Sequence, residues 1–222
     1  MTDEARDGQA ASPARPVYDA ERAKAFFDAV VAIALTLLIL PLMESLGEVA
    51  AADDDASDWF AEHNWQLVSF LLSFAIIAMF WINHHRLFAR VERVSTGLLW
   101  VAMAWLLSIV WLPVATAMSG RMSDTDVVAR IVYIGSMIVV CLITLGLRLY
   151  LHRHPALHEI TERDLRHGAA VDLSMAVLFA AALGIALLFP VIGYSALFLM
   201  FLTGPMQRVF ARLLRAENSA AR

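Results

Sequence analysis

The sequence lacks most of the features by which enzymes and secreted domains are recognised. It contains one cysteine, Cys141, so an intramolecular disulfide and a cysteine cluster for zinc are both excluded. Charged residues make up only 17% of the chain. No glycine-rich phosphate loop, dinucleotide-binding turn or nucleophile elbow occurs along it. The sequence therefore predicts neither a nucleotide-dependent enzyme nor a hydrolase.

Apolar residues, in contrast, are abundant. They account for 60% of the 222 residues, and the mean hydropathy is +0.65. Soluble domains are only about 45–50% apolar. The composition indicates an integral membrane protein whose partner is the lipid bilayer, and no nucleic acid is expected.

Six apolar segments predict an all-α membrane protein with six transmembrane helices. They lie at about Ala25–Met43, Trp65–Ile82, Gly97–Met118, Val127–Leu147, Ala169–Phe189 and Val191–Leu202. A helix needs about 20 apolar residues to cross a bilayer core. In the sixth segment Gly193, Gly204 and Pro205 weaken the pattern, so that helix can be short or kinked.

The remaining residues are assigned to tails and connections. Residues 1–21 are polar and lack the parts of a signal peptide, which predicts a disordered cytosolic tail. The transmembrane domain is expected over residues 22–212, followed by a cytosolic tail at 213–222. Residues 44–64 hold several aspartates and no Lys or Arg, and we interpret them as a loop.

The distribution of basic residues predicts the orientation of the chain. With the N-terminus inside, almost all of the 17 Lys and Arg residues fall in cytoplasmic regions. These are Arg6, Arg15, Arg22, Lys24, Arg86, Arg90, Arg93, Arg148, Arg153, Arg163, Arg166, Arg208, Arg212, Arg215 and Arg222. Only Arg121 and Arg130 fall outside. By the positive-inside rule, we expect a multi-pass protein of the cell membrane with both termini cytoplasmic.

The first apolar segment carries an acid and a hydroxyl, Asp28 and Thr36. An acid within a membrane span is costly, so it normally faces protein or water and marks a functional region. At helical spacing Ile33, Leu37 and Leu40 share one uncharged face, with Thr36 beside them. We predict that this face lines a pore, and a chain of this size would most simply build one by forming oligomers.

A second set of polar residues ends the second segment, at Asn83, His84, His85 and Arg86. The topology places the histidine pair at the same depth as Asp28, which favours a network that fixes the first helix. The alternative is that these side chains extend to the interface without specific partners. Because Asp28 lies six residues after Arg22, the two do not share a helix face, and their partners should come from other helices.

Other candidate residues have simpler explanations. Adjacent histidines point in different directions on a helix, and the histidines near residue 155 lie in a basic loop. No metal site and no cofactor are therefore expected. Trp59, Trp65, Trp81 and Trp100 are interpreted as interfacial aromatics. Asp172 can join a cytoplasmic polar layer, but an N-terminal helix charge is preferred.

Two motifs carry a resemblance to a known family. The first helix opens with Arg22-Ala-Lys-Ala-Phe26-Phe27-Asp28, and the second ends with Trp81-Ile-Asn-His84-His85-Arg86-Leu-Phe88. The chain resembles bacterial members of the lysosomal potassium-channel family TMEM175, whose first-helix motif is Arg-x-x-x-Phe-Ser-Asp. Phe27 stands where that motif has serine. The resemblance extends from Arg22 over nearly the whole chain.

The resemblance implies a fold, a function and a set of site residues. It implies a homotetramer in which the first helices line a path for potassium ions. Ile33 would form the main constriction, Leu37 and Leu40 would be further apolar pore positions, and Thr36 would be linked to selectivity. The residues implied to hold the pore helix are Arg22, Phe26, Asp28, His84 and His85. The alternative left open by Phe27 is a nonselective cation or proton leak channel on the same scaffold.

Overall fold

The computed structural model describes residues 17–52, 55–123, 126–189, 194 and 197. Within these ranges, five helices are long and apolar enough to cross a membrane. They correspond to the first five predicted segments. Most of the sixth segment lies outside the described residues.

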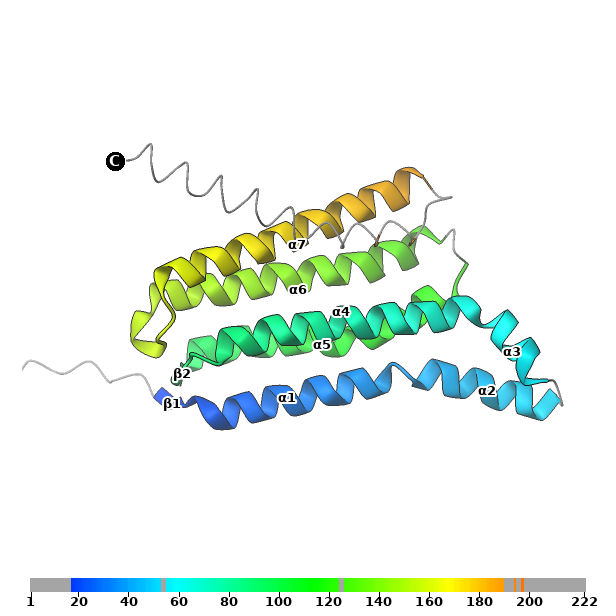
Figure 1. The fold of residues 1–222 in the computed structure, drawn as a ribbon, viewed down its shortest axis with the longest axis horizontal. Coiled ribbons are helices and arrows are strands. Elements are labelled where there is room, and N and C mark those ends of the chain that lie inside the picture. The colour runs from blue at the N-terminus through cyan, green and yellow to red at the C-terminus, as the bar shows by residue number, and fades with distance from the viewer. Residues whose placement is uncertain (1–16, 53–54, 124–125, 190–193, 195–196, 198–222) are drawn as a thin grey trace, which may run out of the picture.

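The described chain is helical apart from two short strands. Its elements are β1 (Val17–Asp19), α1 (Ala20–Leu37), α2 (Leu40–Ala52), α3 (Ala56–Glu62), α4 (Asn64–Phe88), β2 (Arg93–Ser95), α5 (Thr96–Arg121), α6 (Val127–Arg153), η1 (Pro155–Leu157) and α7 (Glu162–Leu188). The long helices lie side by side in an elongated bundle, with α1 and α2 along one edge, α4 and α5 in the middle, and α6 and α7 beyond them (Figure 1). In this arrangement α1 packs against α4 and α5, while α6 packs between α5 and α7.

The first apolar segment is a broken helix. α1 ends at Leu37, and α2 begins at Leu40 after a two-residue turn. Pro41 explains the break, because it has no N–H to donate to the carbonyl of Leu37 one turn earlier. Leu40 therefore belongs to α2, whereas the sequence pattern placed it on a continuous helix with Ile33.

Parts of two regions that were predicted to be irregular form helices or a strand. The interpretation of residues 44–64 as a loop is wrong, since α2 continues to Ala52 and α3 follows at Ala56–Glu62. There Trp59 is buried, and its indole N–H donates to the hydroxyl of Ser45 at 3.3 Å. The disordered tail was predicted through residue 21, but β1 and the first turn of α1 occupy residues 17–21. Asp19 caps α1 by accepting from the amide of Glu21.

The start of α1 is joined by backbone hydrogen bonds to the α4–α5 connection. β1 pairs antiparallel with β2, with Tyr18 opposite Val94. The amide of Ala20 then donates to the carbonyl of Glu92. This pairing explains the β1 strand, which no local sequence pattern indicates, because its partner lies more than seventy residues later in the chain.

The same connection also bonds to the α6–α7 connection on its other side. Val91 forms a bridge with His158, the amide of Glu92 donates to Leu157, and that of Glu159 donates to Arg90. The segment before α1, the α4–α5 connection and the α6–α7 connection are thus joined by hydrogen bonds in one layer at the same end of the bundle. This layer fixes where α1 begins relative to α5 and α7.

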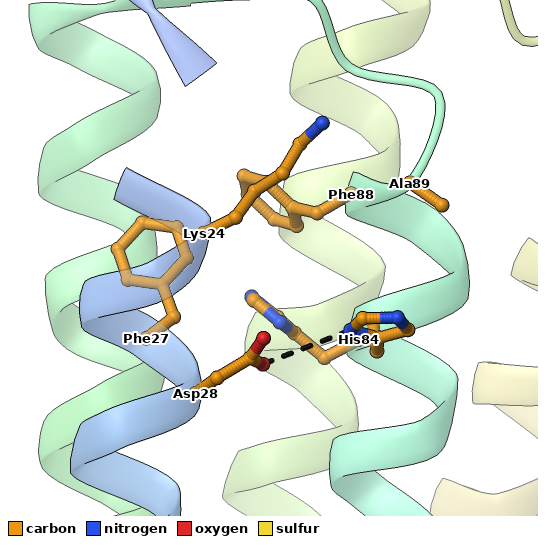
Figure 2. Close-up of a pocket in the computed structure, with 7 residues that line it drawn as sticks. Lys24, Phe27, Asp28, His84, Phe88 and Ala89 are labelled. Carbon is orange, nitrogen blue, oxygen red and sulfur yellow. Dashed lines mark ion pairs between the residues drawn. The ribbon is translucent and has the colours of Figure 1, made fainter. Parts of the chain in front are cut away.

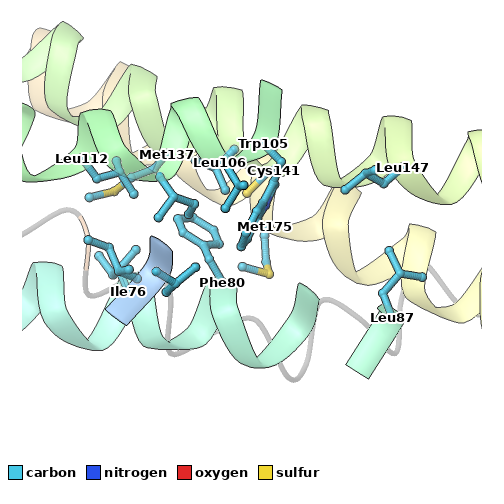
Figure 3. Close-up of a cluster of buried hydrophobic side chains, with 14 of the residues drawn as sticks. Ile76, Phe80, Leu87, Trp105, Leu106, Leu112, Met137, Cys141, Leu147 and Met175 are labelled. Atoms are coloured by element: carbon cyan, nitrogen blue, oxygen red, sulfur yellow. The ribbon is translucent and has the colours of Figure 1, made fainter. Parts of the chain in front are cut away.

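The apolar core is formed by α1, α4, α5, α6 and α7, and Figure 3 shows part of it. Trp105 of α5 lies at its centre and is fully buried, with Phe80, Met137, Cys141 and Met175 among its labelled members. The core contains hydroxyls as well as hydrocarbon. Hydroxyls that bond across helices contribute to packing where lipid offers no hydrophobic drive.

Candidate functional site

The face of α1 predicted to line a pore is exposed in the single chain. Ile33 is 59% exposed, Leu37 is 38% exposed and Leu40, just after the break, is 49% exposed. The opposite side of the same helix is buried against α4 and α5, through Phe27 and Val31. α1 therefore has one apolar face inside the bundle and a second that needs lipid or another protein surface.

Thr36 lies on this exposed side. Its hydroxyl donates to the carbonyl of Ile33 at 2.7 Å. This bond satisfies the hydroxyl proton and leaves the oxygen lone pairs as acceptors on an otherwise apolar surface. The arrangement can offer a weak oxygen ligand to a passing cation.

Asp28 is bonded to two residues of α4. The indole N–H of Trp81 donates to Asp28 Oδ1 at 2.8 Å. His85 Nδ1 lies 3.7 Å from the same oxygen and forms an ion pair when the ring is protonated (Figure 2). Trp81 and His85 lie one turn apart on α4, and their ring centroids are 5.4 Å apart. Asp28 and His85 are thus brought together, and their role in holding the first helix stays a prediction.

A small cavity of about 30 Å³ lies beside this contact. It is lined by Lys24, Phe27, Asp28, His84, His85, Phe88 and Ala89 of α1 and the end of α4 (Figure 2). A cavity of this size can hold a water molecule where polar groups are available to bind it. The structure thus places titratable groups of two helices around one small space.

His84 has a different role from the one predicted. It is 2% exposed, stacks on Trp105 at a centroid distance of 3.7 Å and lies against Phe88 at 4.4 Å. It makes no ion pair with Asp28. Neighbouring residues on a helix point about 100° apart, so His85 faces Asp28 while His84 turns into the core. His84 therefore contacts α1 through the ring of Phe27 and not through Asp28.

Phe27, where the family motif has serine, is part of that aromatic cluster. It is 1% exposed and meets the rings of His84 and Phe88 edge-on, at centroid distances of 5.6 and 5.3 Å. A phenyl ring here packs α1 against α4 by apolar contact rather than by a hydrogen bond. The position remains one at which α1 is held, but by different chemistry.

Two other predicted network residues are not brought to Asp28. Phe26 is 52% exposed, and its ring lies edge-on to that of Phe27 at a centroid distance of 6.4 Å. Arg22 is exposed, and among the described residues it makes no ion pair. Both face away from α4 because they lie on the outer side of the first turns of α1.

Some residues of the site were missed by sequence reasoning. Trp81 was interpreted as an interfacial aromatic, although its spacing of four residues from His85 places both on one helix face. Asp172 was interpreted as a helix N-terminal charge, which is wrong because α7 begins at Glu162 and Asp172 is 1% exposed. It pairs with Arg148 instead.

His152 and His158, outside this region, have structural partners. His152 lies 3.1 Å from Glu162. Both ring nitrogens of His158 bond to backbone, one to the carbonyl of Leu151 and the other to the amide of Ile160. No group of three His, Cys, Asp or Glu side chains among the described residues could hold a metal ion.

Comparison with known proteins finds similar sequences among potassium channels. A sequence model described as the endosomal/lysosomal potassium channel TMEM175 matches residues 22–113. A potassium channel of Streptomyces collinus is 36% identical over 99 residues, which cover 44% of this chain and 46% of that protein. A potassium channel of Chamaesiphon minutus is 30% identical over 155 residues, covering 66% of this chain and 71% of that protein.

A solved structure extends the match to most of the fold. The crystal structure of a lysosomal potassium-selective channel TMEM175 homolog from Chamaesiphon minutus superposes with a TM-score of 0.57 and 25% identity, over 83% of this chain and 97% of that one. The sequence match to the Streptomyces collinus protein spans about half of that relative's length. With the Chamaesiphon minutus relative matched over most of its length and the fold shared, this chain belongs to the TMEM175 family.

Proposed function

We propose that this protein is a potassium-permeable cation channel of the cell membrane. The observation that carries the proposal is the apolar face of Ile33 and Leu37, continued by Leu40 at the start of α2, which is exposed although the other side of α1 is buried. The Thr36 hydroxyl lies on the same exposed side of α1. The family consists of ion channels, and we propose no enzymatic activity.

The proposed path requires more than one copy of the chain. One helix face cannot enclose a passage, whereas identical faces arranged around a symmetry axis can. We therefore propose a homotetramer in which the α1 helices surround the path. Both termini would be cytoplasmic, since the basic residues gather at the end of the bundle where α1 and α5 begin.

The proposed constriction would act through the hydration of the ion. A narrow ring of branched aliphatic side chains expels water, so ions pass only when the ring widens or becomes hydrated. Ile33 would form the narrowest ring, with Leu37 and Leu40 beyond it. Oxygens of Thr36 next to these rings would favour potassium, which loses its water more easily than sodium.

The Asp28 contacts would hold α1 in place for this role. Trp81 and His85 of α4 contact Asp28 in the first turns of α1, and Phe27 of α1 packs against Phe88 of α4.

The second candidate is a nonselective cation or proton leak channel on the same scaffold. It is favoured by Phe27, which removes a side-chain hydroxyl from the start of the helix, and by the small cavity beside Asp28 and His85.

Ion flux from liposomes containing the purified protein tests the proposal. We expect a potassium flux well above the sodium flux, and we expect Ile33→Asn to change the rate or the selectivity. Leu107→Asn is the matched control, because Leu107 is 71% exposed on α5 and lies outside the proposed path. Equal potassium and sodium flux would favour the nonselective candidate. No flux from folded tetramers, or equal effects of the two substitutions, would contradict the proposed pore face.

A further inference from the structure

Three polar side chains from three helices form a closed ring near one end of the bundle. Arg148 Nε of α6 donates to Asp172 Oδ2 of α7 at 2.5 Å. Arg148 Nη2 donates to Asn83 Oδ1 of α4 at 2.8 Å. The amide of Asn83 in turn donates to Asp172 Oδ1 at 2.6 Å. We call these three residues the Asn83 triad.

The triad is buried among the spanning helices. The side chains of Arg148 and Asp172 are 9% and 1% exposed. Removing two charges from water costs several kcal/mol per ion, and a buried pair is often no more stabilising than apolar residues of the same volume. Stability alone is therefore a weak reason for such a pair, which favours a role in orienting the helices that it joins.

α7 is shaped to receive the guanidinium. A Cβ added at Gly168 would lie 2.1 Å from Arg148 Nη1 and 2.3 Å from its Cζ. Glycine at this position lets the guanidinium lie directly against the backbone of α7, and a larger residue would require Arg148 to shift. The close fit at Gly168 and the bonds to Asp172 and Asn83 together define where the guanidinium lies.

The end of α4 sends consecutive side chains to different helices. Trp81 and His85 reach Asp28 of α1, while His84 enters the core against Trp105 of α5. Asn83, two residues after Trp81, points to α6 and α7. Two residues correspond to about 200° around a helix. The Asn83 triad therefore holds the side of α4 opposite to the one that contacts α1.

We propose that Arg148 and Asp172 are positioning residues for α1, acting through Asn83. By holding Asn83 they set the rotation of the last turns of α4, and this rotation aims Trp81 and His85 at Asp28. The α6–α7 pair, which lies away from α1, would in this way determine how firmly the first helix is held. The effect on conduction rests on the proposed channel function, whereas the effect on the Trp81–Asp28 contact does not.

The hydrogen bond between Trp81 and Asp28 can be followed directly by NMR. In ¹⁵N-tryptophan-labelled protein, the indole N–H resonance of Trp81 is assigned with Trp81→Phe, and Asp28→Asn gives its position when the carboxylate is lost. Asn83→Ala removes the connection to α4 while leaving Arg148 paired with Asp172. We expect it to move the Trp81 resonance towards the Asp28→Asn position.

A single substitution at Arg148 or Asp172 would leave the other charge buried and unpaired, and the protein could then misfold. A charge-free variant that removes both charges avoids this problem. Arg148→Met with Asp172→Leu removes both charges together and should move the Trp81 resonance in the same direction. The matched control is Arg90→Gln with Asp164→Asn, which removes an exposed ion pair between the connection after α4 and the first turn of α7. We expect this control to leave the resonance unchanged.

The Trp81 resonance tests the positioning of α1, and the ion flux tests the proposed channel function, so the two can fail independently. An unchanged Trp81 resonance in the folded Asn83→Ala and charge-free proteins overturns the inference, and the triad is then only a tie between helices. A shifted resonance supports it, whether or not the wild-type protein conducts. Where it conducts, we expect the potassium flux of Asn83→Ala to change by roughly two- to thirty-fold, the range of coupling between distant sites.

Discussion

The indole N–H of Trp81 donates to the carboxylate of Asp28 at 2.8 Å, joining α4 to α1. An acid in the first membrane span thus has a neutral donor as its nearest partner, with His85 further away at 3.7 Å. A neutral donor holds the carboxylate whatever the protonation state of the imidazole. Trp81 is therefore the residue whose loss should most weaken the hold on Asp28.

Trp81→Phe should lower the thermal stability of the protein in detergent. A hydrogen bond to a charged group contributes about 1.5–3 kcal/mol, and the phenyl ring preserves most of the packing. Fluorescence-detected size-exclusion chromatography after heating measures the loss. Trp100→Phe is the control, because Trp100 is 73% exposed and no change is expected there. Equal melting of the two variants would contradict a stabilising Trp81–Asp28 bond.

Phe27→Ser should destabilise the protein, although it restores the family motif. The ring of Phe27 is 1% exposed and packs on His84 and Phe88. Truncating a buried phenylalanine typically costs about 3–5 kcal/mol, more than one new hydrogen bond returns. Thermal unfolding of Phe27→Ser and Phe27→Leu compares the two effects. A Phe27→Ser protein at least as stable as Phe27→Leu would show that the serine finds a strong partner.

Gly168→Ala should be much more harmful than the same change at Gly184. The new Cβ would overlap the Arg148 guanidinium at Gly168, whereas nothing lies within 4 Å of a Cβ at Gly184. At an open helical site, glycine to alanine stabilises by up to about 1 kcal/mol. Thermal melting of the two variants should therefore shift in opposite directions. A neutral Gly168→Ala would mean that Arg148 can leave its place without cost.

The sequence predicted the features that depend on length, polarity and helical period. The first five spans follow from runs of apolar residues, and the exposed face of Ile33 and Leu37 follows from spacing. Asp28 could be selected because an acid in a span is rare. Each of these signals is contained within one short stretch of the chain.

The features that were missed depend on contacts between distant stretches. Asn83, Arg148 and Asp172 come from three helices, and nothing local shows that their side chains meet. β1 exists because β2 lies beside it. Which of the two adjacent histidines faces Asp28 could not be predicted for a different reason. The direction of each side chain depends on how α4 is rotated, which no local pattern determines.

Thr36→Val should reduce the preference for potassium over sodium, whereas Thr36→Ser should retain it. Valine has the same shape as threonine without the oxygen, so the apolar face of α1 is kept and the acceptor next to Ile33 is lost. Serine keeps the hydroxyl and loses a methyl group. Because the path would contain no cage of carbonyls, the selectivity at stake is small, and we expect a change of a few-fold.

Paired potassium and sodium flux measurements in liposomes give the selectivity of each variant. Thr36→Val removes the oxygen while keeping the branching at Cβ and nearly the same size, and Thr36→Ser controls for any effect of altering the helix at this position. Serine can make the same bond to the Ile33 carbonyl, so the backbone before the α1–α2 break should be unaffected. If Thr36→Val kept the wild-type flux ratio while Thr36→Ser lost it, shape rather than the oxygen would determine which ion passes, and the apolar rings alone would have to account for selectivity.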